Sequence, residues 1–191
     1  MRIDVSKATS GQKVLGGAIE GRRHLAGFLQ LMGDEPAQPQ PLYLDFGGID
    51  LATASHMRES IMALNSLIRS RRSKFYLVVA NANEKVKEDL AVLTRLAGSV
   101  LLSCKLNQRE QISDVELIGA LDPKQALTFK LVSERGETDA RELTATSEED
   151  VQQTAWNNRL AALEALGVIA EISHGKSKKY RPVLKGAKHG K

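Results

Sequence analysis

Short apolar runs alternate with longer amphipathic segments through the first half of the chain. Phe75–Ala80 is apolar at every position, which is typical of a strand covered on both faces of a parallel sheet. Similar runs occur at 42–46 and 99–104, and the segments between the three runs, 53–70 and 84–97, carry apolar residues at helical spacing. Strand, helix, strand, helix, strand is the order of a parallel α/β layer, so we expect an α/β fold.

The margins of this layer are less regular. Residues 2–5 alternate in polarity and predict a short strand, and a helix is expected from about Ser10 to Met32. Gly16-Gly17 weakens that helix and is a point at which it divides. Ile112–Ile118 predicts either an edge strand or a connector, and the unit is expected to close near Leu121.

Beyond Leu121 the pattern changes, because three helical segments follow one another without a strand between them. They are expected at 123–134, 138–143 and 147–166. Ser147 is the predicted N-cap of the third helix, and the acidic residues after it suit the positive end of the helix dipole.

A hairpin is predicted after the third helix. Two short strands, at 168–172 and 179–183, flank a basic turn that contains Gly175. The order helix, helix, helix, hairpin is that of a winged helix. We therefore expect two domains: residues 1–121, with a mostly parallel or mixed sheet and helices, and residues 122–191, a small winged helix with a basic tail.

Positive charge gathers at the C-terminal end. The net charge is +4, yet residues 168–191 hold seven Lys/Arg against one acidic residue, while residues 122–167 hold five against nine. A concentrated positive field attracts phosphate groups or acidic protein surfaces. The alternative is a tail that only solubilises the chain.

Composition and cysteine usage restrict the class of protein. Apolar residues make up 42% and charged residues 26%, an ordinary globular mix, and no window approaches the roughly 18 apolar residues of a membrane span. The single Cys104 excludes an internal disulfide, and the first residues lack the apolar stretch of a signal peptide. We expect a cytoplasmic protein that does not enter a membrane.

Catalytic motifs are not found. The four histidines show no metal-ligand spacing, and the glycine pairs match no phosphate-binding fingerprint. Cys104 lies inside an apolar run, which indicates inert packing. The sequence therefore predicts no metal, no cofactor and no enzymatic activity.

The C-terminal segment resembles the winged helix of the MarR and ArsR groups of bacterial transcription regulators. The residues that carry the resemblance are Thr154–Leu160, Leu163 and Leu166–Ile169, followed by His174–Arg181 as the wing. The resemblance implies that the third helix is the recognition helix and that Trp156 belongs to the core.

The stretch Leu44–Ser55 resembles the STAS-like domains related to anti-sigma-factor antagonists, with a strand, a glycine turn and a serine-containing entry into a helix. The family's regulatory phosphoserine would fall on Ser55. Thr53 and His56 stand where that family has an acidic residue and a glycine. The alternative is that Ser55 only caps or packs its helix.

The leading functional hypothesis is a DNA-binding transcriptional regulator. Amide side chains pair with adenine and cations contact guanine or phosphate. The predicted base-reading residues are Gln152, Gln153, Asn157 and Asn158, with Arg159 on phosphate or guanine. The predicted phosphate contacts of the wing are Lys176, Lys178, Lys179 and Arg181, extended by Lys185, Lys188 and Lys191.

The expected partner of this regulator is double-stranded DNA, bound by a homodimer, with the STAS-like part supplying dimerisation or partner sensing. The alternative is a non-catalytic adaptor that binds a kinase or another protein and uses the winged helix for docking. The acidic residues Glu148, Glu149 and Asp150 favour the adaptor, since they repel phosphate. The basic run Arg69, Arg71, Arg72 and Lys74 is either a partner surface or a solvated loop.

Overall fold

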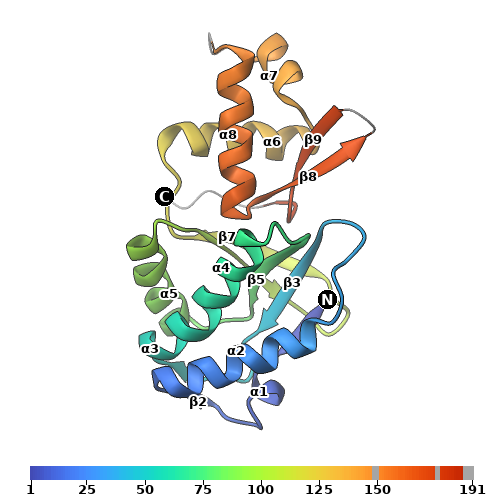
Figure 1. Ribbon diagram of the computed structural model, residues 1–191. Helices are drawn as coiled ribbons and strands as arrows, with labels where there is room; N and C mark the ends of the chain where they lie inside the picture. The colour runs from blue at the N-terminus through green and yellow to red at the C-terminus, as the bar shows by residue number, and fades with distance from the viewer. Residues whose placement is uncertain (148–150, 175–176, 187–191) are drawn as a thin grey trace.

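The computed structural model describes residues 1–147, 151–174 and 177–186 of the 191-residue chain. Figure 1 shows an N-terminal part, built around a sheet, and a C-terminal part of helices and a hairpin stacked on it. Among the described residues no helix combines the length and apolar character that crossing a bilayer requires.

A five-stranded sheet in the order β1-β3-β5-β6-β7 organises the N-terminal part. The first four strands are parallel, and β7 pairs antiparallel with β6. The strands are β1 (Arg2–Asp4), β3 (Gln40–Asp45), β5 (Phe75–Ala80), β6 (Leu101–Leu106) and β7 (Ile112–Ile118). The predicted α/β class with a mostly parallel, mixed sheet is confirmed, and the segment at 112–118 is the edge strand.

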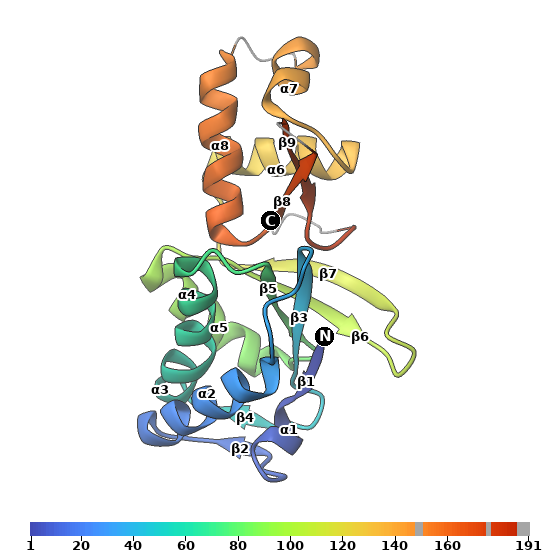
Figure 2. The same cartoon turned by 45° about the vertical axis from the view of Figure 1, so that its right-hand side comes forward.

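The helices of this part cover one face of the sheet (Figure 2). They are α1 (Val5–Ala8), α2 (Ala18–Met32), α3 (Ala54–Met57), the π-helical turn η1 (Arg58–Met62), α4 (Ala63–Ser70) and α5 (Glu84–Ala97). A two-stranded parallel pair, β2 (Val14–Leu15) with β4 (Leu51–Ala52), lies beside α2.

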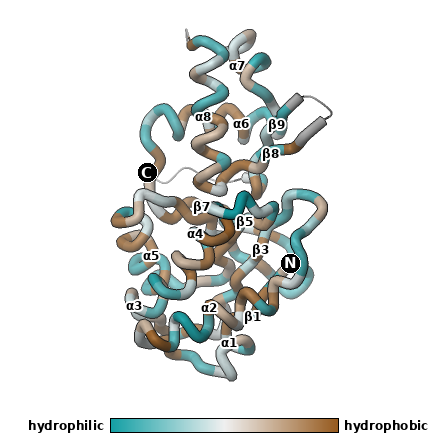
Figure 3. Tube along the Cα trace, in the orientation of Figure 1, coloured by the Kyte–Doolittle hydropathy of each residue, from teal (hydrophilic) through white to brown (hydrophobic). Residues whose placement is uncertain are grey.

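The alternation of side chains along β5 divides the core in two. Leu77 and Val79 pack with the helix residues of the first hydrophobic cluster, whereas Val78 and Ala80 belong to a second cluster. That second cluster continues through β6 to Trp156 and its neighbours in the C-terminal part. Figure 3 shows the hydrophobic residues concentrated on the inner strands and α4.

The C-terminal part begins at a strong helix start. Asp122 and Gln125 form a reciprocal capping box, with Pro123 in the first turn, the position where its missing N–H costs nothing. The elements are α6 (Pro123–Arg135), α7 (Ala140–Thr146), α8 (Gln153–Leu166), β8 (Ile169–His174) and β9 (Ser177–Pro182). Thr138 adds an antiparallel bridge to Tyr180 of the β8–β9 hairpin.

Three predicted helix starts are wrong. Helix α2 begins at Ala18 rather than Ser10, because Gly17 at φ 80° lets the chain leave β2 and turn into the helix. Helix α7 begins at Ala140 rather than Thr138, after the N-cap Asp139.

Ser147 is likewise not the N-cap of the third helix. It follows α7 as its C-cap, and Gln152 is the N-cap residue of α8. The acidic residues 148–150, on which part of the prediction rested, lie outside the described residues.

Candidate nucleic-acid interface

Helix α8 has one apolar side that anchors it. Trp156, Leu160 and Leu163 are each 0% exposed and pack in the second hydrophobic cluster. The helix ends at Gly167, whose φ of 81° is the left-handed conformation typical of a C-cap. The expectation that Trp156 belongs to the core is confirmed, so the opposite side of α8 faces solvent.

That opposite side is polar and uncharged. The structure places all four predicted amide side chains, Gln152, Gln153, Asn157 and Asn158, at exposed positions on the first turns of α8. Thr154, Ala161 and Ala165 are also exposed and continue the same surface. We call this set, from Gln152 to Ala165, the α8 face; its short side chains leave the helix free to approach another surface closely.

Arg159 does not join the α8 face. It is half-buried, and its guanidinium carbon lies 4.8 Å from the centre of the Trp156 ring. A cation over an indole face is attracted by the ring quadrupole. The guanidinium therefore covers the core tryptophan and is set apart from the predicted amides.

The hairpin cations are engaged by acidic residues. The Lys178 ammonium lies 3.0 Å from Glu171, and that of Lys179 lies 3.2 Å from Glu142 and 3.7 Å from Glu137. The hydrogen bond to Glu142 raises the pKa of Lys179 and lowers that of Glu142. Exposed ion pairs contribute only about 0–1 kcal/mol each, so a phosphate that displaced one would meet a small cost.

Two of the remaining predicted wing residues, Arg181 and Lys185, are among the described residues. Arg181 lies at the base of the hairpin and donates to the Pro39 carbonyl at 3.5 Å, next to the N-terminal part. Lys176, Lys188 and Lys191 lie outside the described residues. Lys185 is exposed. The structure thus brings the four amides together on α8, while Lys178 and Lys179 of the hairpin are paired with acidic residues.

A clamp of three side chains fixes α8 to the N-terminal part. The Arg69 guanidinium at the end of α4 lies 3.5 Å from Glu164 of α8 and stacks 4.2 Å from the ring centre of Tyr76. The Tyr76 hydroxyl donates to the same Glu164 oxygen at 3.2 Å, and burial raises the pKa of Tyr76 to about 12. Arg69 also donates to the carbonyls of Ser73 and Phe75.

Ser55 lies in the first turn of α3 and is half-buried. Its hydroxyl is 3.2 Å from that of Thr53, and Thr53 is the N-cap that accepts from the His56 amide. The capping role considered for Ser55 therefore belongs to Thr53. Regulation through Ser55 stays a prediction.

Two histidines that sequence reasoning did not pair meet in the core. His24 Nδ1 of α2 lies 2.8 Å from His56 Nε2 of α3, and His56 Nδ1 lies 3.3 Å from the Ser60 hydroxyl in η1. Burial lowers the pKa of both, that of His56 to about 4, with the neighbouring His24 as a further cause. The two positions are 32 apart in the sequence, so no local pattern signals the contact.

This pair predicts a loss of stability in mild acid. The unfolded histidine takes up a proton near its ordinary pKa of 6.5, whereas folded His56 does so only at about 4. The unfolded state therefore binds more protons in this window, and the free energy of unfolding falls as pH drops through it, by about 2 kcal/mol after allowance for solvent screening.

Urea unfolding at several pH values from 7.5 to 4.5 measures the effect. In the matched variant, His24→Gln with His56→Gln, the glutamine amides can still form hydrogen bonds but do not titrate. The free energy of unfolding of this variant should therefore fall less than that of the wild type over the same pH range. An equal fall in both proteins would contradict the assignment.

A second polar cluster closes the carboxyl edge of the parallel strands. Asp45 accepts from Arg2, from the Gly47 amide at 2.9 Å and from Asn81 at 2.9 Å. The Asn81 side chain in turn donates to the Leu106 carbonyl and accepts from the Leu106 backbone N–H. The carboxylate is thus held by charge and three sets of donors, an arrangement that joins β1, β3, β5 and β6.

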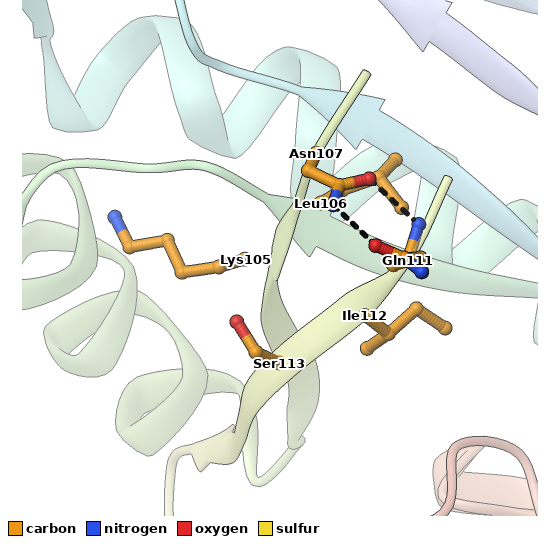
Figure 4. A pocket seen from close by; sticks show the side chains of 6 residues that line it. All are labelled: Lys105, Leu106, Asn107, Gln111, Ile112 and Ser113. Atoms are coloured by element: carbon orange, nitrogen blue, oxygen red, sulfur yellow. Dashed lines mark hydrogen bonds between the residues drawn. The ribbon is translucent and has the colours of Figure 1, made fainter. Parts of the chain in front are cut away.

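Surface hollows near this edge do not assemble reactive groups. One of about 520 Å³ lies on the β6–β7 hairpin, where Asn107 and Gln111 bond each other and the Lys105 side chain extends away from them (Figure 4). Burial raises the pKa of the Cys104 thiol to about 11, which disfavours the nucleophilic thiolate. Within the described ranges, no three His, Cys, Asp or Glu residues are placed to hold a metal ion.

No model of a known protein family matches the chain, and no curated protein matches it.

Proposed function

We propose that this protein is a cytoplasmic, non-catalytic regulator that binds duplex DNA through the α8 face. The observation that carries the proposal is the exposed row of Gln153, Asn157 and Asn158 on a helix whose other side is anchored by Trp156. An α-helix fits the major groove, and side-chain amides pair bidentately with adenine there. The helix, helix, helix, hairpin order supports a winged helix of the transcription-regulator kind.

The short side chains of the α8 face support close approach to the bases. Ala161 and Ala165 are exposed and place only methyl groups between the helix backbone and a groove wall. A single module of this size buries little surface, so we propose that a homodimer, formed through the STAS-like part, occupies two half-sites.

Fluorescence anisotropy with a labelled mixed-sequence duplex tests the proposal. Binding is expected at about 50 mM salt and should weaken steeply towards about 200 mM. Binding releases cations from the DNA phosphates, and this release becomes less favourable as the salt concentration rises. Selection from a random duplex pool should then enrich an adenine-containing site. Absence of binding at every salt concentration overturns the proposal.

A protein-docking adaptor is the second candidate. It is favoured by the pairing of Lys178 with Glu171 and of Lys179 with Glu142, which lowers the charge that the hairpin offers to phosphate. In this case the α8 face contacts a kinase or another protein. Purification from the native host should then recover one partner at fixed stoichiometry and free of nucleic acid, and the anisotropy experiment should be negative.

A further inference from the structure

The turn between α4 and β5 places exposed cations directly beneath the C-terminal end of α8. Arg71, Arg72 and Lys74 are exposed, while Arg69 in the same run is half-buried and pairs with Glu164 in the clamp. The contact is close, since a side-chain carbon added at Gly167, the C-cap of α8, would lie 3.3 Å from Arg69 Cδ. We call Arg71, Arg72 and Lys74 the basic corner.

A groove joins the basic corner to the α8 face. It encloses about 560 Å³, and its walls come from the end of α8, the β8–β9 hairpin and the corner itself. The lining residues used here are Ala161, Ala165, Arg72, Lys74, Glu171 and Lys178. Arg72 and Lys74 of the basic corner therefore share one groove with Ala161 and Ala165, the C-terminal end of the α8 face.

The charges along this groove do not cancel. Glu164 forms an ion pair with Arg69, and Glu171 forms one with Lys178, so both acidic residues that line the groove are already paired. The Lys74 ammonium donates to the uncharged Ala37 carbonyl at 2.7 Å.

One further acid approaches the corner from outside the groove. The Glu35 carboxylate accepts from the Ser73 hydroxyl at 2.9 Å and from the Lys74 backbone amide, so a negative charge lies beside the turn that carries the corner. Among the described residues, no ion pair engages the guanidinium groups of Arg71 and Arg72, which leaves them as the uncompensated cations of the surface.

The distance along α8 from the amides to the groove is comparable with the width of the DNA major groove. Asn158 and Ala165 are seven residues apart, which is about 10 Å along a helix at 1.5 Å per residue. The major groove is about 12 Å wide and is bordered by the phosphate backbones. A helix that reads bases near Asn158 therefore brings a border of the groove towards the basic corner.

We propose that the basic corner binds the DNA phosphate backbone, so that the duplex held by α8 also runs across the N-terminal part. This inference rests on the proposed function and deepens it, because it assigns the STAS-like part a direct share of the DNA contact. The Arg69–Glu164 ion pair and the Tyr76 hydrogen bond connect the end of α4 to α8, so the corner and the helix are held beside each other. Arginine presents a planar set of donors that fits phosphate oxygens.

The test is the salt dependence of DNA binding by Arg71→Gln with Arg72→Asn. Asparagine is chosen at 72 because that residue has φ 51°, a left-handed conformation that asparagine tolerates. Loss of two phosphate contacts should reduce the slope of log K against log salt by about 1.8 and weaken binding roughly 10- to 100-fold at low salt. Arg71→Lys with Arg72→Lys keeps both charges and should largely restore the slope.

The matched control is Lys13→Gln with Lys85→Gln, which removes two exposed charges near β2 and at the start of α5, away from α8. Its slope should stay close to that of the wild type, apart from a small general effect of net charge. Thermal unfolding of each variant establishes that it is folded.

The outcomes separate the two proposals. If the wild type binds DNA and the corner variant has the same slope as the control, the corner proposal is overturned and DNA binding by α8 stands. If the wild type does not bind DNA, both are overturned. A reduced slope in the corner variant alone, restored by lysine, supports the corner as a phosphate surface.

Discussion

Replacement of Trp156 by alanine is expected to lower the free energy of unfolding by about 3 to 5 kcal/mol, the usual cost of removing a large aromatic side chain from a packed core. The side chain is 0% exposed and packs with Leu160, Leu163 and Phe129 in the cluster that continues to the sheet. Because the anchored side of α8 loses its largest member, we also expect DNA binding to be lost.

Trp156→Phe is the matched variant. It keeps an aromatic ring and removes an indole Nε1 that is buried without a hydrogen-bond partner among the described residues. Its cost should therefore be clearly smaller. Urea unfolding followed by circular dichroism measures both variants, since the chain has one tryptophan and its fluorescence is lost. A loss below about 1 kcal/mol for the alanine variant would contradict a core role.

The second large effect is expected from charge on the α8 face. Asn157→Glu with Asn158→Glu should weaken DNA binding at least about 100-fold, because like charges set against each other across an interface cost several kcal/mol. Both residues are exposed, so the free energy of unfolding should change by no more than about 0.5 kcal/mol.

Two controls isolate the position of the new charge. Gln12→Glu with Gln108→Glu adds the same charge at exposed sites of the N-terminal part and should change affinity only slightly. Asn157→Ala with Asn158→Ala removes the amides without repulsion and should cost about 1–3 kcal/mol for each lost base contact. Anisotropy at one salt concentration compares all three. Equal affinity of the glutamate variant and the wild type would place the interface elsewhere.

Sequence patterns predicted the inner elements well because local chemistry and tertiary packing agree there. The apolar run of β5 is fully buried in the sheet, and α5 lies between an Asn83 N-cap and the Gly98 C-cap. The helix start at Ser147 was mispredicted because a serine followed by acids resembles a cap, while the chain there ends α7.

The candidate interface was predictable in part. The amides of α8 are exposed because Trp156, Leu160 and Leu163 lie on the buried side of the helix. The helical spacing of these apolar residues can be read in the sequence. The hairpin cations were predicted as phosphate contacts, and no local pattern indicated that Lys179 pairs with Glu142, 37 residues earlier. The basic run at 69–74 gave no sign that Arg69 would pair with Glu164, 95 residues later.

Sequence alone determined the α/β class, the inner strands and helices, and the buried side of α8, because these follow from hydrophobic periodicity over neighbouring residues. Only the tertiary structure decided which charges are paired, that His24 meets His56, and that the basic corner adjoins the α8 face. Those contacts join residues distant along the chain, and their energies depend on distance and burial, which no local pattern records.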